Sequence, residues 1–147
     1  MKPLAVAALL LVLLTGCAAD PVTADLELVT STVDPASAPA FLDSPQTQAD
    51  VINDLDVGIF GVNTESIRYQ GEWKGLSVYL GVAGTAGVHI ITGTPGDSHS
   101  WGSGSTGGNA VIGLDMSADS GLQYLPQGTA DIPDGWVVLS DYVIVYE

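Results

Sequence analysis

The sequence predicts an α+β domain: a small, mainly antiparallel β-sheet with one N-terminal helix packed on it. Two observations lead to this prediction. From residue 67 onward, apolar and polar residues alternate with the period of two that is typical of strands, and turn signals separate the runs. Before residue 67, one stretch repeats its apolar residues at helical spacing. An antiparallel sheet covered by one helix accommodates both patterns.

The helix is expected to start near residue 43 and to end before Gly58. Asp43 or Ser44 can serve as N-cap, Pro45 suits the first turn, and Gln46 stands in capping-box register with Asp43. The apolar face is expected to consist of Ala49, Val51, Ile52 and Leu55.

Seven strands are expected, and two turns between them have strong signals. Lys74-Gly75 separates the first two runs as a hairpin, and Pro133-Asp134-Gly135 precedes the last two. The stretch from Thr92 to Asn109 is expected to be a long loop. The expected strands are 67–72, 76–83, 88–92, 110–114, 122–125, 136–139 and 142–146.

The N-terminus has the features of an export signal. Lys2 is followed by an apolar run from Pro3 to Leu14, which is too short for the roughly 20 residues of a transmembrane helix. Leu14-Thr15-Gly16-Cys17 closes this run and resembles the lipobox of bacterial lipoprotein precursors. The resemblance implies that residues 1–16 are a signal peptide and that Cys17 becomes the lipid-modified N-terminus. The alternative is a soluble secreted protein that is cleaved after Ala18 or Ala19.

Lipidation also explains why Cys17 is the only cysteine in the chain. An exported thiol with no partner for a disulfide needs another role. A diacylglycerol group on Cys17, with fatty acids such as palmitate, supplies one. Two acyl chains give stable membrane anchoring, whereas one chain binds only marginally. We therefore expect a lipid-anchored protein on the extracytoplasmic face of the cell membrane.

Composition divides the rest of the chain into a tether and a domain. Residues 17–40 are rich in Ala, Thr, Ser, Asp and Pro and contain no aromatic residue, which predicts a flexible tether. A tether of this length reaches roughly 25–30 Å. Residues 41–147 are expected to form a single globular domain, since that length supports one modest core but not two.

The charge excludes one class of partner. The chain has 17 acidic and three basic residues, and only Arg68 and Lys74 follow Cys17 among the basic ones. Nucleic-acid binding depends on lysines and arginines that displace counterions, so we expect no nucleic-acid partner. Anionic headgroups also repel such a domain, so the membrane must be reached through the lipid on Cys17.

Two short motifs give a further resemblance. Pro45-Gln46-Thr47 near the start of the domain and Gly135-Trp136-Val137-Val138 near its end are similar to landmarks of small uncharacterised exported proteins of high-GC Gram-positive bacteria. The resemblance supports the fold class and implies no activity.

Two motifs with catalytic associations lack their required context. Residues 102–107 match G-x-G-x-x-G, but a dinucleotide site needs a strand directly before the motif and a helix after it. Gly96-Asp97-Ser98 resembles the nucleophile block of an esterase family whose histidine base lies late in the chain. No histidine follows His99. We therefore expect no cofactor and no catalytic activity.

No metal site is expected either. His89 and His99 are the only histidines, too few for a zinc site without carboxylate ligands. Asp54, Asp56 and Glu65 fall at positions 1, 3 and 12 of a calcium loop, but position 6, where glycine makes the turn, is occupied by Ile59.

The sequence therefore favours a non-catalytic binding or interaction module whose partner is a cell-surface protein or glycan. Its candidate binding residues are Trp101 and His99, both in the long glycine- and serine-rich loop. Trp101 either folds back on the core or is displayed for contact. The alternatives are an extracytoplasmic hydrolase that uses carboxylates and a protein that binds divalent cations.

Overall fold

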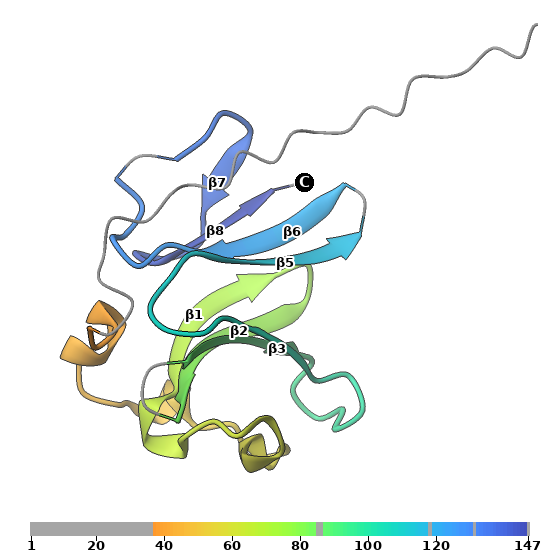
Figure 1. Cartoon of the computed structure of the whole chain (residues 1–147). Helices are drawn as coiled ribbons and strands as arrows, with labels where there is room; N and C mark the ends of the chain where they lie inside the picture. The colour runs from red at the N-terminus through yellow and green to blue at the C-terminus, as the bar shows by residue number, and fades with distance from the viewer. Residues whose placement is uncertain (1–36, 85–86, 118, 131, 147) are drawn as a thin grey trace, which may run out of the picture.

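The computed structural model describes residues 37–84, 87–117, 119–130 and 132–146, which form two four-stranded antiparallel sheets (Figure 1). The first sheet has the strand order β1-β2-β3-β4, and the second has the order β5-β6-β8-β7. The strands are β1 (Arg68–Trp73), β2 (Leu76–Ala83), β3 (Gly87–Gly93), β4 (Gly102–Ser105), β5 (Ile112–Ser117), β6 (Ser120–Tyr124), β7 (Trp136–Val138) and β8 (Val143–Tyr146). The predicted mainly antiparallel β architecture is confirmed, with two sheets where one was expected.

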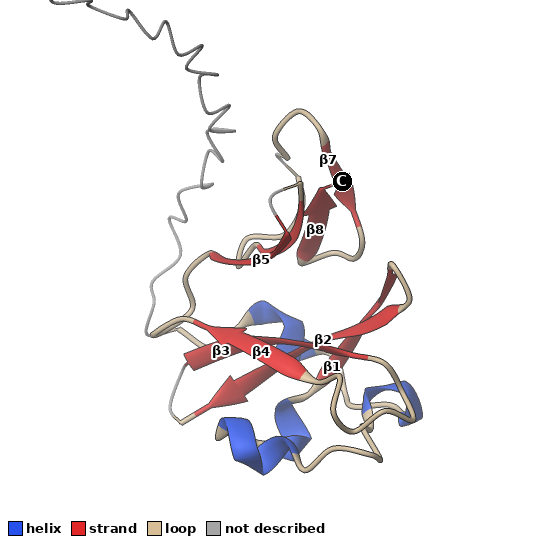
Figure 2. Ribbon diagram, turned by 90° about the vertical axis from the view of Figure 1, so that its right-hand side faces the viewer, coloured by secondary structure: helices blue, strands red, loops and turns tan. Residues whose placement is uncertain are grey.

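The first sheet is the middle layer of the described structure. One of its faces packs on the second sheet, and the other faces short helical segments, as Figure 2 shows from the side. The core between the sheets combines residues of both: Phe41, Trp73, Val78, Leu80, Val88, Ile90, Ile112, Leu122, Tyr124, Val143 and Val145. A second cluster lies on the opposite face of the first sheet: Val57, Val62, Ile67, Tyr79 and Ile91. Strand β2 is therefore buried on both faces.

The predicted α-helix is wrong. The region instead contains four 3₁₀ segments: η1 (Ala40–Asp43), η2 (Gln48–Asp50), η3 (Val57–Phe60) and η4 (Thr64–Ser66). Ser44, which precedes Pro45, is extended with ψ of 138°, as expected before a proline, and this ends η1. Further along, polar side chains bond to the local backbone and compete with helix formation. Ile52 and Leu55 still pack on the second cluster.

Most strand predictions are confirmed with shifts of a few residues. Lys74 and Gly75 both have positive φ, 51° and 77°, which is the conformation of a two-residue type I′ hairpin turn. The prediction of a loop from Thr92 to Asn109 is wrong in part, because Gly102–Ser105 forms β4 and pairs with β3. Glycine and serine have low strand propensity, so local sequence gives no signal for this edge strand.

The predicted signal peptide 1–16, Cys17 and most of the predicted tether lie outside the described residues. At the start of the described part, Phe41 is buried, and its ring meets that of Tyr124 edge-on at 5.9 Å. Among the described residues, no helix has the length and apolar character to span a membrane.

Candidate functional site

An open groove of about 350 Å³ lies at the edge of the first sheet. Three segments that are distant in sequence form it: the stretch around η1 and η2, the edge strand β1, and the turn between β7 and β8. Its lining residues are Phe41, Ser44, Pro45, Thr47, Ala49, Asp50, Arg68, Tyr69, Gln70, Ser140, Asp141 and Tyr142. This mixture of aromatic rings and hydrogen-bonding side chains is typical of sites for small polar ligands.

Asp50 connects η2 to the edge of β1. Its side chain is only 5% exposed and accepts three hydrogen bonds. Two come from the backbone N–H and hydroxyl of Thr47, and the third comes from the backbone N–H of Tyr69 at 2.6 Å. The carboxylate thus occupies a donor of the edge strand that would otherwise be open to another chain. All of this bonding is structural.

Arg68, the first residue of β1, stabilises another part of the groove wall. Its Nε donates to the carbonyl of Ser44 at 2.9 Å, and its Nη1 donates to the carbonyls of Glu65 at 3.0 Å and Ile67 at 2.8 Å. Within the described residues it forms no ion pair, and Nη2 has no hydrogen-bond partner. Arg68 therefore holds the 3₁₀ segments against β1 with three of its five N–H groups.

Gln70 and Ser140 join the two sheets across the groove. The Ser140 hydroxyl donates to Oε1 of Gln70 at 2.7 Å and accepts from the backbone N–H groups of Tyr142 and Val143. This bonding fixes the β7–β8 turn and with it the position of Asp141.

Several polar groups of the groove have no partner among the described residues. They are the Asp141 carboxylate, the Tyr142 hydroxyl and Nη2 of Arg68. The Tyr69 ring instead packs on Tyr79 of the second cluster, with centroids 5.3 Å apart, and burial, followed by the charge of Glu72, raises the pKa of Tyr69 above its ordinary value. The Tyr142 hydroxyl can both donate and accept a hydrogen bond.

Trp101, a predicted binding residue, is folded back on the second cluster. Its ring covers Gly93 so closely that a Cβ at that position would lie 2.3 Å from it, and its centroid is 6.0 Å from that of Tyr79. The first of the two orientations considered for Trp101 is thus the observed one. A binding role for its remaining exposed edge stays a prediction.

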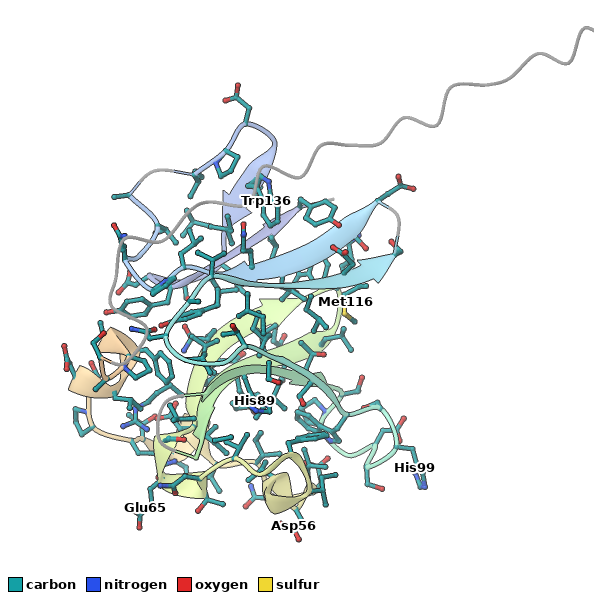
Figure 3. All side chains as sticks on the ribbon, viewed as in Figure 1. Asp56, Glu65, His89, His99, Met116 and Trp136 are labelled. Atoms are coloured by element: carbon teal, nitrogen blue, oxygen red, sulfur yellow. The ribbon has the colours of Figure 1, made fainter. Side chains whose placement is uncertain are left out.

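His99, the other predicted binding residue, lies at the tip of the β3–β4 loop and points away from the domain (Figure 3). Its side chain is 97% exposed. Its Nδ1 lies 3.4 Å from the Ser98 hydroxyl and 3.9 Å from the Asp97 carboxylate. His99 is not among the residues that line the groove. In the described part of the chain, its ring also makes no stacking contact with Trp101.

Two of the three carboxylates of the calcium-loop alternative, those of Asp54 and Asp56, have structural partners. Asp54 accepts a hydrogen bond from the Gly96 N–H, which links the loop before η3 to the β3–β4 loop. Asp56 accepts a hydrogen bond from the Gly58 N–H and caps the N-terminus of η3. Figure 3 shows Asp56 and Glu65 at separate places on the outer surface. In the described part of the chain, no three His, Cys, Asp or Glu side chains come together as a potential metal site.

His89 lies on the face of β3 that is turned toward the 3₁₀ segments. Its Nδ1 is buried without a hydrogen-bond partner, and burial lowers the pKa of the imidazole. The neutral ring is therefore the favoured form at neutral pH.

A second aromatic surface lies on the other sheet, where Trp136 of β7 packs on Tyr146 of β8 with ring centroids 4.7 Å apart. The Tyr146 hydroxyl donates to the Asp115 carboxylate at 3.0 Å. Val137 and Val138 beside them are exposed.

Sequence reasoning did not identify the groove. Its walls come from segments as far apart in sequence as Phe41 and Tyr142, and the Ser140–Gln70 bond joins two of them across 70 residues. One signal was present, since Arg68 is one of two basic residues after Cys17. In the comparisons with known proteins, no family model, no curated protein and no solved structure matches this chain.

Proposed function

We propose that this chain is a bacterial lipoprotein that is anchored by Cys17 to the extracytoplasmic face of the cell membrane and binds a ligand there without chemistry. The lipobox-like Leu14-Thr15-Gly16-Cys17 supports the anchor. The groove at the edge of β1 supports binding, because it combines unpaired hydrogen-bonding groups with the half-buried ring of Tyr142. This combination is the single structural observation on which the binding role depends.

The groove is a rigid site in this proposal. The bonds of Asp50, Arg68 and Ser140 fix the three segments that form its walls. Binding to walls that are already ordered avoids the entropy cost of ordering them during association. The unpaired groups of Arg68, Asp141 and Tyr142 then provide the direct contacts.

The hydrolase alternative requires two carboxylates that can exchange protons or attack a substrate. Two carboxylates, Asp50 and Asp141, line the groove. Asp50 already accepts three hydrogen bonds and is needed for the fold of the wall. Its engagement favours a binding role for the groove over acid–base catalysis.

Metabolic labelling with a fatty acid tests the anchor. We expect label in the wild-type protein and none in Cys17→Ser, together with release of the variant from the membrane fraction. Protease added to intact cells or spheroplasts should degrade the anchored wild type, because it lies on the outer side. Equal labelling of both proteins contradicts the anchor, and protection of the wild type contradicts the location.

A further inference from the structure

We propose that the groove around Arg68 and Asp141 binds a neutral, polyhydroxylated ligand, of the size of one or two sugar units in a cell-surface glycan. This inference rests on the proposed binding function and adds its ligand class. The fold already engages some of the polar groups in the groove, and the others are still available to a ligand.

Anionic ligands are disfavoured although an arginine lines the groove. Arginine grips a carboxylate or phosphate best through two parallel N–H donors on neighbouring nitrogens. In Arg68, Nε and both N–H groups of Nη1 already donate to the carbonyls of Ser44, Glu65 and Ile67. Each two-nitrogen grip uses Nε or Nη1, so only single-nitrogen contacts from Nη2 remain. The formal net charge of −14 further repels anions.

Cationic ligands are disfavoured by the state of the two carboxylates. Both carboxylate oxygens of Asp50 already accept hydrogen bonds, from Thr47 and from the backbone N–H of Tyr69. Asp141 is exposed and thus well hydrated, and Arg68 lines the same groove. A single exposed carboxylate near a guanidinium gives little net attraction for a cation.

Hydroxyl groups of a ligand match the hydrogen-bonding groups of the groove that are still available. Nη2 of Arg68 is a donor, the Asp141 carboxylate is an acceptor, and the Tyr142 hydroxyl can act as either. A ligand that carries several hydroxyls can satisfy donors and acceptors together. The Tyr142 ring is only partly buried, so it also offers an apolar surface to the C–H groups of a sugar.

The size of the groove agrees with this ligand class. Its volume of about 350 Å³ is near the lower end of the range for small-molecule sites. A folded protein partner usually contacts about 20–30 residues on each side, whereas twelve residues line this groove. A short segment of a glycan is therefore a better fit than a globular domain.

The test is a binding titration with the purified lipoprotein, kept in a zwitterionic detergent because sugar-based detergents would compete. The probes are three neutral disaccharides (cellobiose, maltose and N,N′-diacetylchitobiose), an anionic one (digalacturonic acid), a cationic one (the chitosan dimer) and the zwitterion alanyl-alanine. We expect at least one neutral probe to bind with a Kd of about 1 mM or tighter, as measured by calorimetry. The charged probes should bind at least tenfold more weakly.

Two aspartate variants place the site. Asp141→Ala should weaken binding of the neutral probe about tenfold, the effect of losing a hydrogen bond to a charged group. Asp134→Ala is the matched control, because Asp134 is an exposed turn residue at the opposite end of β7 and should leave the Kd unchanged. Tyr142→Phe should weaken binding less than Asp141→Ala, since it retains the ring.

Four outcomes overturn the inference. Binding of no neutral probe contradicts it, and so does tighter binding of any charged probe than of the neutral ones. If alanyl-alanine binds and Asp141→Ala abolishes its binding, the glycan inference fails while the proposed binding function survives. If Trp136→Ala abolishes sugar binding and Asp141→Ala does not, the ligand occupies the aromatic surface on β7 and β8, and the assignment to the groove is wrong.

Discussion

Replacing Asp50 with asparagine tests how the groove wall is held together. The change keeps the shape of the side chain but removes its charge and one of its two acceptor oxygens. Asparagine can therefore serve either the Thr47 donors or the Tyr69 N–H, but not both.

The magnitude follows from the bonds that are lost. Asp50 is 5% exposed, so a donor left unpaired beside it is largely cut off from water. One buried donor without a partner costs about 1–3 kcal/mol, and the remaining bonds weaken by about 1 kcal/mol without the charge. We expect Asp50→Asn to lower the free energy of unfolding by about 2–4 kcal/mol. Asp134→Asn, at an exposed turn, should change it by less than about 0.5 kcal/mol.

Urea unfolding at constant pH measures the free energies, and amide hydrogen exchange adds a local readout. The Tyr69 amide should exchange slowly in the wild type and faster in Asp50→Asn, because its acceptor is lost or neutral. If Asp50→Asn and Asp134→Asn unfold at the same urea concentration and the Tyr69 amide keeps its protection, the role assigned to Asp50 is refuted.

Three further predictions concern the two clusters. Gly93→Ala should lower stability by about 1–3 kcal/mol and shift tryptophan fluorescence, since the new Cβ would lie 2.3 Å from the Trp101 ring. Gly102→Ala is the control: a Cβ there would have open space, so stability and fluorescence should stay unchanged within error. Trp101→Ala should lower stability by about 2–4 kcal/mol through lost packing. His99→Ala should leave stability unchanged, because the His99 side chain is 97% exposed. Equal unfolding midpoints of the two variants in calorimetry would contradict the observed packing of Trp101. Burial raises the pKa of Tyr124, so the unfolded chain ionises first and stability should fall as pH rises above about 10. Tyr124→Phe should be less stable at pH 8, because Oδ1 of Asn109 loses the donor hydroxyl, and its stability should fall less steeply with pH. Equal slopes for the two proteins in urea titrations across pH 8–11 would show the raised pKa to be wrong.

The parts of the fold that sequence predicted correctly depend on local patterns. The β1–β2 hairpin follows from alternation on both sides of Lys74-Gly75, two residues whose backbone can adopt the turn. Strands β3 and β8 are likewise rich in β-branched residues, and Leu122 and Tyr124 of β6 stand two residues apart, the period of a sheet. Such signals need no knowledge of distant contacts.

The errors arose where a distant partner decides the local structure. Asp50 was counted inside a helix, yet its carboxylate bonds to the Tyr69 N–H, 19 residues away, and η2 ends there. Strand β4 has only glycine and serine and exists because β3 offers it a free edge. The capping box that forms is that of Thr47 with Asp50, whereas the expected one paired Asp43 with Gln46. Gln46 instead donates to the carbonyl of Thr64.

The groove was beyond sequence reasoning for the same reason. No single segment contains its chemistry, since Asp50, Arg68 and Asp141 belong to three elements that meet only in the folded domain. Trp101 was singled out by residue type and by the composition of its loop. Neither of these reports that Gly93 leaves room for its ring.

Intact-mass spectrometry of the protein isolated from its native membrane tests the central claim most directly. The lipoprotein account predicts a chain that begins at Cys17 and carries the added mass of a diacylglycerol group, with the lipid recovered on the N-terminal peptide after proteolysis. A chain that begins after Ala18 or Ala19, or one that retains residues 1–16 without lipid, would contradict it.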